Sequence, residues 1–215
     1  TASNNTAVGY SALIRNTTSG NNTAVGALSL DANTTGSANT SLGLGALSEN
    51  TTASNNTAVG YFAGLSVTTG ANNTFVGGLA GDGTDDGQSN TAVGISALSA
   101  NCGDNNVAVG SSAGTAITGG SNTVVGNAAG FALTSGSNNL FIGKDSGRTG
   151  SPGGNHVTSD NRIVLGDENI SHANIQVDWS VASDARDKTD FTALDLGLDF
   201  VKALAPVTYK WDKRS

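Results

Sequence analysis

Few residues of this chain have the types and spacing that chemistry requires, and the densest group is one acidic turn. It reads Gly81-Asp82-Gly83-Thr84-Asp85-Asp86-Gly87 and is the only acidic cluster of the repetitive region. Carboxylates in a glycine-rich loop suit a hard cation such as Ca²⁺. A calcium-binding roll of nonapeptide repeats, however, needs such a loop in every repeat, and here it occurs once. The sequence therefore favours a polar turn, with a cation site as the alternative.

The other side chains that could do chemistry stand apart from one another. Cys102 is the single cysteine, so it can form neither an internal disulfide nor a two-cysteine zinc site. His156 and His172 are not expected to bind a metal within one chain, although three copies on a symmetry axis could hold an ion. Glu49 and Glu168 are the only glutamates, so a pair of carboxylates that cleaves glycosides is not expected within one chain. No cofactor is expected.

The composition narrows the class of protein. The chain has 215 residues in 21.2 kDa, with 30 Gly, no Met and 5% aromatic residues. A core of large interdigitated side chains is hard to build from this material, so a compact globular enzyme is disfavoured. The net charge of −7 gives no electrostatic basis for binding nucleic acid or an anionic membrane surface. No apolar run reaches the roughly 18 residues of a membrane-spanning helix, so we expect no membrane insertion.

An internal repeat accounts for this composition. An aliphatic residue followed by Gly recurs at intervals of 17 residues, then 16, 16, 17 and finally 23. Asn stands four positions before each of these glycines, except in the last copy, where Arg162 replaces it. A small residue and then Leu or Gly follow three and four positions after it. The repeat glycines are Gly9, Gly26, Gly43, Gly60, Gly77, Gly94, Gly110, Gly126, Gly143 and Gly166.

Each repeat predicts one coil of an all-β parallel β-roll or β-solenoid. Two short strands joined by Gly and Asn turns fit into about 17 residues, whereas a helical repeat does not. In the first strand, alternation places the aliphatic residue before Gly on the same face as the residue two positions earlier, mostly Thr. We expect this Thr and Val face to be the buried one. The stacked Asn side chains are expected to form hydrogen bonds along the column.

One coil of this kind has almost no interior, so each chain needs partners. Small side chains on both faces and few charges favour a homotrimer about the rod axis. The repeat resembles the head repeats of trimeric autotransporter adhesins, through units such as Asn5-Thr6-Ala7-Val8-Gly9 and Asn106-Val107-Ala108-Val109-Gly110. This resemblance covers residues 1–143 and implies a left-handed parallel β-roll that packs as a trimer.

The composition changes sharply after Gly143. Residues 1–143 carry seven charged side chains, and the last 72 residues carry twenty. We therefore divide the chain into a β-roll shaft or head at 1–146, a loop, terminal coil and neck at 147–182, and a C-terminal segment at 183–215.

The C-terminal segment carries the most specific signal in the sequence. A short amphipathic helix that Pro206 ends, followed by a strand from Val207, predicts a small α+β unit. The segment resembles the start of the intramolecular chaperone domain of the endosialidase type, found at the C-terminus of phage tail spikes and fibres. The matching residues are Ser183-Asp184, Arg186, Lys188, Gly197-Leu198-Asp199-Phe200-Val201, Leu204, Pro206-Val207 and Tyr209-Lys210-Trp211.

This second resemblance implies a role for two residues. In that family the chaperone assembles a trimeric fibre and then cuts itself off between Ser and Asp, with the Ser as nucleophile and a Lys five residues later assisting. Ser183, Asp184 and Lys188 have that spacing. The chemistry is sound, because a desolvated lysine has a lowered pKa and can take the proton of a serine hydroxyl. The resemblance implies one self-cleavage at Ser183-Asp184; the alternative is that this bond stays intact in the chain and that Lys188 is a solvated surface lysine. No enzymatic activity toward external substrates is expected.

Together these features predict a structural and adhesive segment of a phage tail fibre or virion appendage that supports host attachment. Its expected partners are two further copies, other virion tail proteins and a host surface receptor or glycan. One alternative is the trimeric head of a bacterial cell-surface adhesin, and another is a polysaccharide-degrading tail spike. The chaperone-like segment favours the phage fibre, because autotransporter adhesins end instead in a membrane β-barrel anchor.

Overall fold

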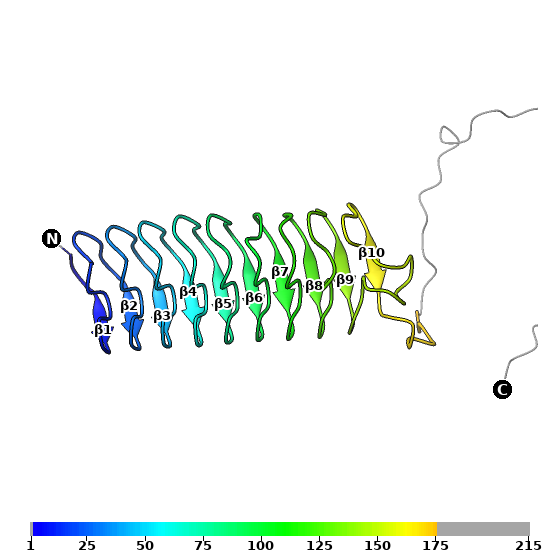
Figure 1. Ribbon diagram of the computed structural model, residues 1–215, viewed down its shortest axis with the longest axis horizontal. Helices are drawn as coiled ribbons and strands as arrows, with labels where there is room; N and C mark the ends of the chain where they lie inside the picture. The colour runs from blue at the N-terminus through cyan, green and yellow to red at the C-terminus, as the bar shows by residue number, and fades with distance from the viewer. Residues whose placement is uncertain (1, 176–215) are drawn as a thin grey trace, which may run out of the picture. The chain divides into compact units, whose positions relative to one another are not determined.

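The chain folds into ten short strands that lie in a single row (Figure 1). The computed structural model describes residues 2–175. All ten strands belong to one compact unit that ends at Ala173. The strands are β1 Thr6–Val8, β2 Thr23–Val25, β3 Thr40–Leu42, β4 Thr57–Val59, β5 Thr74–Val76, β6 Thr91–Val93, β7 Val107–Val109, β8 Thr123–Val125, β9 Leu140–Ile142 and β10 Ile163–Leu165.

Each strand pairs in parallel with the next one along the chain, so the order in the sheet is the order in the sequence. Equivalent residues of successive coils are register partners, as Thr6 is of Thr23. The register is kept through the two 16-residue intervals and across the 23-residue interval, where Leu140 pairs with Ile163. The predicted parallel β-solenoid is therefore confirmed for the described residues.

Each coil contains one strand, whereas the sequence analysis expected two. The residues two and four positions after the repeat Gly adopt left-handed backbone conformations, which in the second coil are Leu28 (φ 57°) and Leu30 (φ 51°). Two such residues so close together bend the chain and leave no room for an extended strand. Backbone hydrogen bonds still join this side to the next coil, as from the Leu30 N–H to the Ala46 carbonyl at 3.1 Å.

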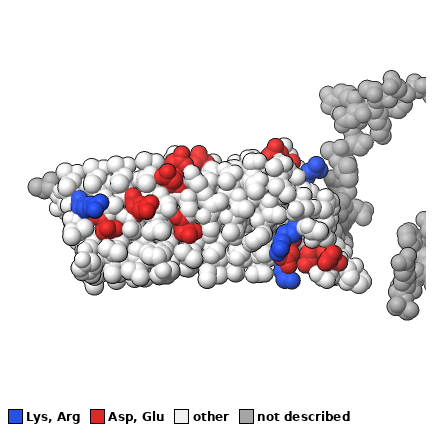
Figure 2. Space-filling view, viewed as in Figure 1, with Lys and Arg blue, Asp and Glu red and all other residues white. Residues whose placement is uncertain are grey.

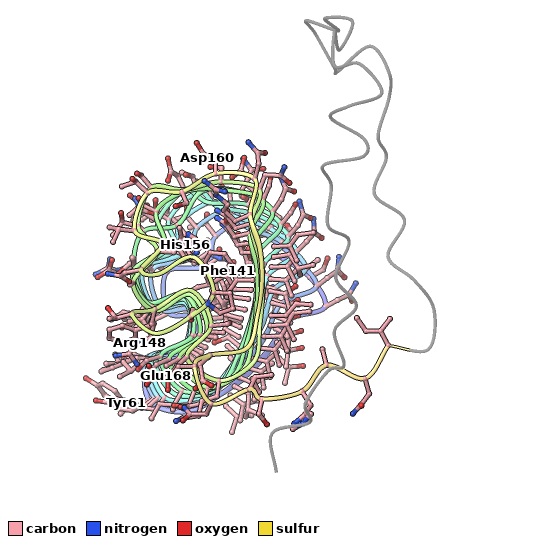
Figure 3. The ribbon with its side chains drawn as sticks, turned by 90° about the vertical axis from the view of Figure 1, so that its right-hand side faces the viewer. Tyr61, Phe141, Arg148, His156, Asp160 and Glu168 are labelled. Carbon is pink, nitrogen blue, oxygen red and sulfur yellow. The ribbon has the colours of Figure 1, made fainter. Side chains whose placement is uncertain are left out.

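The face of the sheet that lies inside the coil is the opposite of the one expected. The middle residue of each strand points inward: Phe75 and Phe141 are fully buried, and Figure 3 shows Phe141 directed into the coil. The flanking residues point outward, so that Val76 remains 37% exposed and Ile142 42%. The prediction of a buried Thr and Val face is therefore wrong. The inward face instead carries the middle side chains and the Asn amides, which reach buried backbone groups.

The Asn residues that precede the strands form a buried column. From Asn22 to Asn122 they are completely inaccessible to solvent. The Oδ1 of each accepts a hydrogen bond from the backbone N–H of the equivalent Asn in the next coil, as Asn56 does from Asn73 at 2.9 Å. The Nδ2 donates to a backbone carbonyl in the following turn, as Asn56 does to Gly70 at 2.9 Å. The predicted Asn ladder is confirmed, and its hydrogen-bond partners are mainly backbone groups.

Large and small side chains are combined so that the narrow interior stays filled. Where a coil has Gly rather than Leu four positions after the repeat Gly, a large middle residue of a strand occupies the space. A Cβ at Gly64 would lie 2.8 Å from the ring of Phe75, and one at Gly81 would lie 2.5 Å from the same ring. A Cβ at Gly147 would likewise lie 2.5 Å from the ring of Phe141. The choice between Leu and Gly in the repeat is therefore set by packing.

The Gly that follows each strand is required by the close approach of adjacent coils. Gly60 has a φ of 143°, and a Cβ built there would lie 2.5 Å from the carbonyl oxygen of Gly77 in the next coil. Neither the backbone conformation nor the space admits a side chain. The same approach repeats from coil to coil, which explains why the repeat is anchored on this residue.

Replacing one Asn of the column tests whether it holds the coils together. We expect Asn56→Ala to lower the free energy of unfolding by about 2–5 kcal/mol, because the Asn73 N–H and the Gly70 carbonyl lose their partners in the core. Chemical denaturation followed by circular dichroism measures this change. The matched control is Asn127→Ala, at an exposed position, where we expect a change within about 0.5 kcal/mol. Equal losses in the two variants would contradict the structural role of the column.

Candidate functional site

The outward side of the sheet presents two parallel columns of side chains. The first residues of the strands form the outer threonine column: Thr6, Thr23, Thr40, Thr57, Thr74, Thr91, Val107, Thr123, Leu140 and Ile163. The third residues form the outer aliphatic column: Val8, Val25, Leu42, Val59, Val76, Val93, Val109, Val125, Ile142 and Leu165. Because side chains alternate along a strand, both columns lie on the same face of the sheet, which we call the outer face.

The outer face carries no charged side chain: one of its columns is aliphatic, and seven of the ten residues of the other are Thr. The exposed fraction is 46% at Leu42 and reaches 67% at Ile163. Near β10 the threonine column itself becomes apolar, with Leu140 and Ile163. Ten strands that are about 4.8 Å apart extend the face over about 45 Å. Soluble monomers rarely expose a contiguous apolar surface of this extent, so the outer face has the properties of an interface.

The acidic turn at residues 81–87 hydrogen-bonds within its own coils. The Asp85 carboxylate accepts a hydrogen bond from the hydroxyl of Thr68 in the preceding coil, and its backbone carbonyl accepts one from the Thr68 N–H. Burial raises the pKa of the neighbouring Asp82. Within residues 2–175, no group of three or more His, Cys, Asp or Glu side chains is placed to hold a metal ion. One carboxylate oxygen of Asp82, Oδ1, is buried without a hydrogen-bond partner.

Cys102 and His156 are both buried. Burial raises the pKa of the Cys102 thiol, so the reactive thiolate is disfavoured. His156 packs on Phe141 with ring centroids 5.6 Å apart, and its Nδ1 and Nε2 lie 3.2 Å from the Ser159 hydroxyl and 3.2 Å from the Pro152 carbonyl oxygen. With both ring nitrogens engaged, His156 anchors the loop before β10.

A pocket that the sequence did not predict lies where the repeat is longest. We call it the end pocket; it has a volume of about 470 Å³. Three successive coils wall it, because Phe131 precedes β9, Lys144, Asp145 and Arg148 follow β9, and Asp167 and Glu168 follow β10. The only sequence signal for it is the rise in charged residues after Gly143.

Charged groups of both signs meet in the end pocket. The Arg148 guanidinium donates a hydrogen bond to Asp145 Oδ1 at 2.6 Å, and the Lys144 ammonium lies 3.1 Å from Oδ2 of the same carboxylate. The Lys144 hydrogen bond, together with that of Arg148, holds the pKa of Asp145 below its ordinary value. The guanidinium also lies 4.9 Å from the centroid of the Phe131 ring. Figure 2 shows a cluster of basic and acidic side chains at the β10 end, on a surface that is otherwise mostly uncharged.

The residues expected to perform self-cleavage, Ser183 and Lys188, lie outside the described residues, as does the C-terminal α+β segment. Residues 183–215 match the family model described as "Chaperone of endosialidase", which supports the resemblance seen in the sequence. Chaperone domains of this family act in trimeric proteins, and the match implies self-cleavage. No curated protein and no solved structure matches the chain. Among the described residues, no helix has the length and apolar character that crossing a membrane requires.

Proposed function

We propose that this chain is a structural and adhesive segment of a phage tail fibre or of another virion appendage. Three left-handed β-solenoids pack about a common axis as the shaft or head at 1–146. Residues 147–182 form the loop, terminal coil and neck, and 183–215 begin the chaperone that assembles the trimer. The observation that carries this proposal is the uncharged outer face, in a chain whose last residues match a chaperone of trimeric proteins.

The geometry of the outer face explains how the copies associate. Removing apolar surface from water stabilises a complex by about 25 cal/mol per Å². Every coil presents nearly the same pair of side chains at the same spacing, so parallel copies in register meet with matching surfaces. The core that a single coil lacks is then built between the chains, from the outer threonine and outer aliphatic columns. Virion tail proteins and a host surface receptor or glycan are the further partners of such a fibre.

Two alternative functions require other features. The head of a bacterial adhesin also needs a trimer, but the chaperone match favours a phage tail fibre or spike. A spike that cleaves polysaccharide needs a carboxyl group with a raised pKa as its general acid. In the end pocket, the ion pairs lower the pKa of Asp145 instead. Asp145 is therefore a poor general acid.

A charge placed in the outer face tests the trimer. Val76 is 37% exposed in the single chain, so Val76→Glu leaves the interior of the coil unchanged but would bury three carboxylates between the chains. We expect the unmodified chain to sediment as an elongated trimer and the variant as a folded monomer, since unpaired buried charges are strongly destabilising. Thr18→Glu, at an exposed residue outside the sheet, is the control and should remain trimeric. If the unmodified chain is monomeric, or if the Val76→Glu variant is trimeric, the outer face is not the trimer interface.

We also propose that Ser183 and Lys188 carry out a single self-cleavage. Packing in the trimer desolvates the Lys188 ammonium and lowers its pKa, so that its neutral amine takes the proton of the Ser183 hydroxyl. The overall change is hydrolysis of the Ser183-Asp184 peptide bond by one water molecule. It leaves a carboxylate on Ser183 and an amine on Asp184. Because each chain is cut once, this chemistry does not make the protein an enzyme for external substrates.

Intact-mass analysis of the full-length protein checks the cleavage. We expect a cut after Ser183 in the unmodified protein, and none in Ser183→Ala or Lys188→Ala. Lys202→Ala, which changes another lysine of the same segment, should still be cut. An unmodified protein that stays whole, or a Ser183→Ala variant that is cut at the same bond, would show that the family chemistry does not apply here.

A further inference from the structure

We propose that the end pocket binds a neutral saccharide. This inference rests on the proposed adhesive role and names both the place and the chemical class of the ligand. The volume of about 470 Å³ falls within the range of about 300–1,000 Å³ that is typical of small-molecule sites. The pocket arises where the 23-residue interval adds residues between β9 and β10.

The lining matches the hydrogen bonding of sugar hydroxyls, which both donate and accept. Lys144 and Arg148 supply donors, Glu168 supplies acceptors, and the amide of Asn155 supplies both. Asp145 holds the two cations at 3.1 Å and 2.6 Å. Because these donors are fixed before a ligand arrives, binding loses less side-chain entropy.

Phe131 lines the pocket with an aromatic ring, and a sugar ring can pack only on the part of it that the Arg148 guanidinium leaves uncovered. Its side chain is 41% exposed although it lies at the wall of a charged pocket. Arg148 lies against the ring at 4.9 Å, and Ala132 extends the apolar patch. One aromatic face beside a few convergent polar groups is a common composition of ligand pockets.

The third wall is held in place by the loop before β10. A Cβ at Gly150 would lie 2.5 Å from Glu168 Oε2, so the absence of a side chain there lets the carboxylate rest on the loop backbone. Asp167 accepts hydrogen bonds from the backbone N–H of Asn169 at 2.9 Å and from its Nδ2 at 3.1 Å. The hydrogen bonds to Asp167 hold Asn169 at the rim of the pocket, next to Glu168.

The charges in the pocket favour a neutral ligand. The carboxylates of Asp145, Asp167 and Glu168 outnumber the two cations, and Asp145 already neutralises much of the charge of both. An acidic sugar would bring a further carboxylate next to Asp167 and Glu168 and be repelled.

The pocket remains accessible when the outer face is covered. Figure 3 shows Arg148 on the side of the coil away from the sheet, and Glu168 away from the outward side chains. A trimer therefore presents three such pockets. Simultaneous engagement of several pockets by a host surface raises the overall avidity without any new contact.

A glycan array with the fluorescently labelled chain tests the proposal. The array carries neutral, sialylated and uronate-containing oligosaccharides, and calorimetric titration follows with the neutral glycan that is retained most strongly. We expect neutral glycans to bind, and Glu168→Gln and Phe131→Ala each to weaken the affinity about tenfold, as loss of a hydrogen bond to a charged group or of an aromatic contact does. Glu49→Gln, at the other glutamate and equally exposed, is the matched control and should bind as before.

Sedimentation of each variant separates this proposal from the proposed function. Retention of no glycan, retention of acidic glycans alone, or binding that neither pocket variant weakens would overturn the saccharide site. If the chain is trimeric in those cases, the proposed fibre function remains supported and only the assignment of the pocket is wrong.

Discussion

Every coil of this protein has to satisfy buried backbone groups inside an interior that is only about one side chain wide. The Asn column meets this requirement: each amide oxygen accepts from the backbone of the next coil, and each amide nitrogen except that of Asn90 donates to a backbone carbonyl in the following turn. The column thereby fixes which face of the sheet lies inside. The Gly residues at the strand ends let adjacent backbones approach closely enough for the column to form.

This constraint also determines what is left on the outside. Since the middle residue of each strand and the Asn occupy the interior, the Thr and aliphatic residues on either side of the middle position are turned outward. They form an uncharged face of Thr and aliphatic side chains along all ten strands, and the interior of one coil is too thin to be an ordinary core. The proposed association of copies through the outer face accounts for both features, and residues 183–215 match a chaperone whose family acts in trimeric proteins.

The sequence predicts the coil better than it predicts the orientation of its faces. The spacing of Asn and Gly is enough to predict the solenoid, its parallel pairing and the Asn ladder. Alternation shows which residues share a face, but not which face is buried when both carry small side chains. The large side chains of Phe75 and Phe141 indicate which face is buried. Their rings fill the space that the glycines of the repeat leave inside the coil, at Gly64, Gly81 and Gly147. The end pocket could not be predicted, since it depends on the path of one irregular loop between β9 and β10.

Distances between copies test most directly whether the outer face lies between chains. Cys102 is buried, so a nitroxide reagent would label a cysteine introduced at Thr57, in the outer threonine column, or at Thr18, outside the sheet. Pulsed electron–electron double resonance then measures the distances between the labels within an assembly. The account predicts short distances from Thr57→Cys and much longer ones from Thr18→Cys. Longer distances from Thr57→Cys than from Thr18→Cys, or no dipolar coupling at Thr57→Cys, would contradict it.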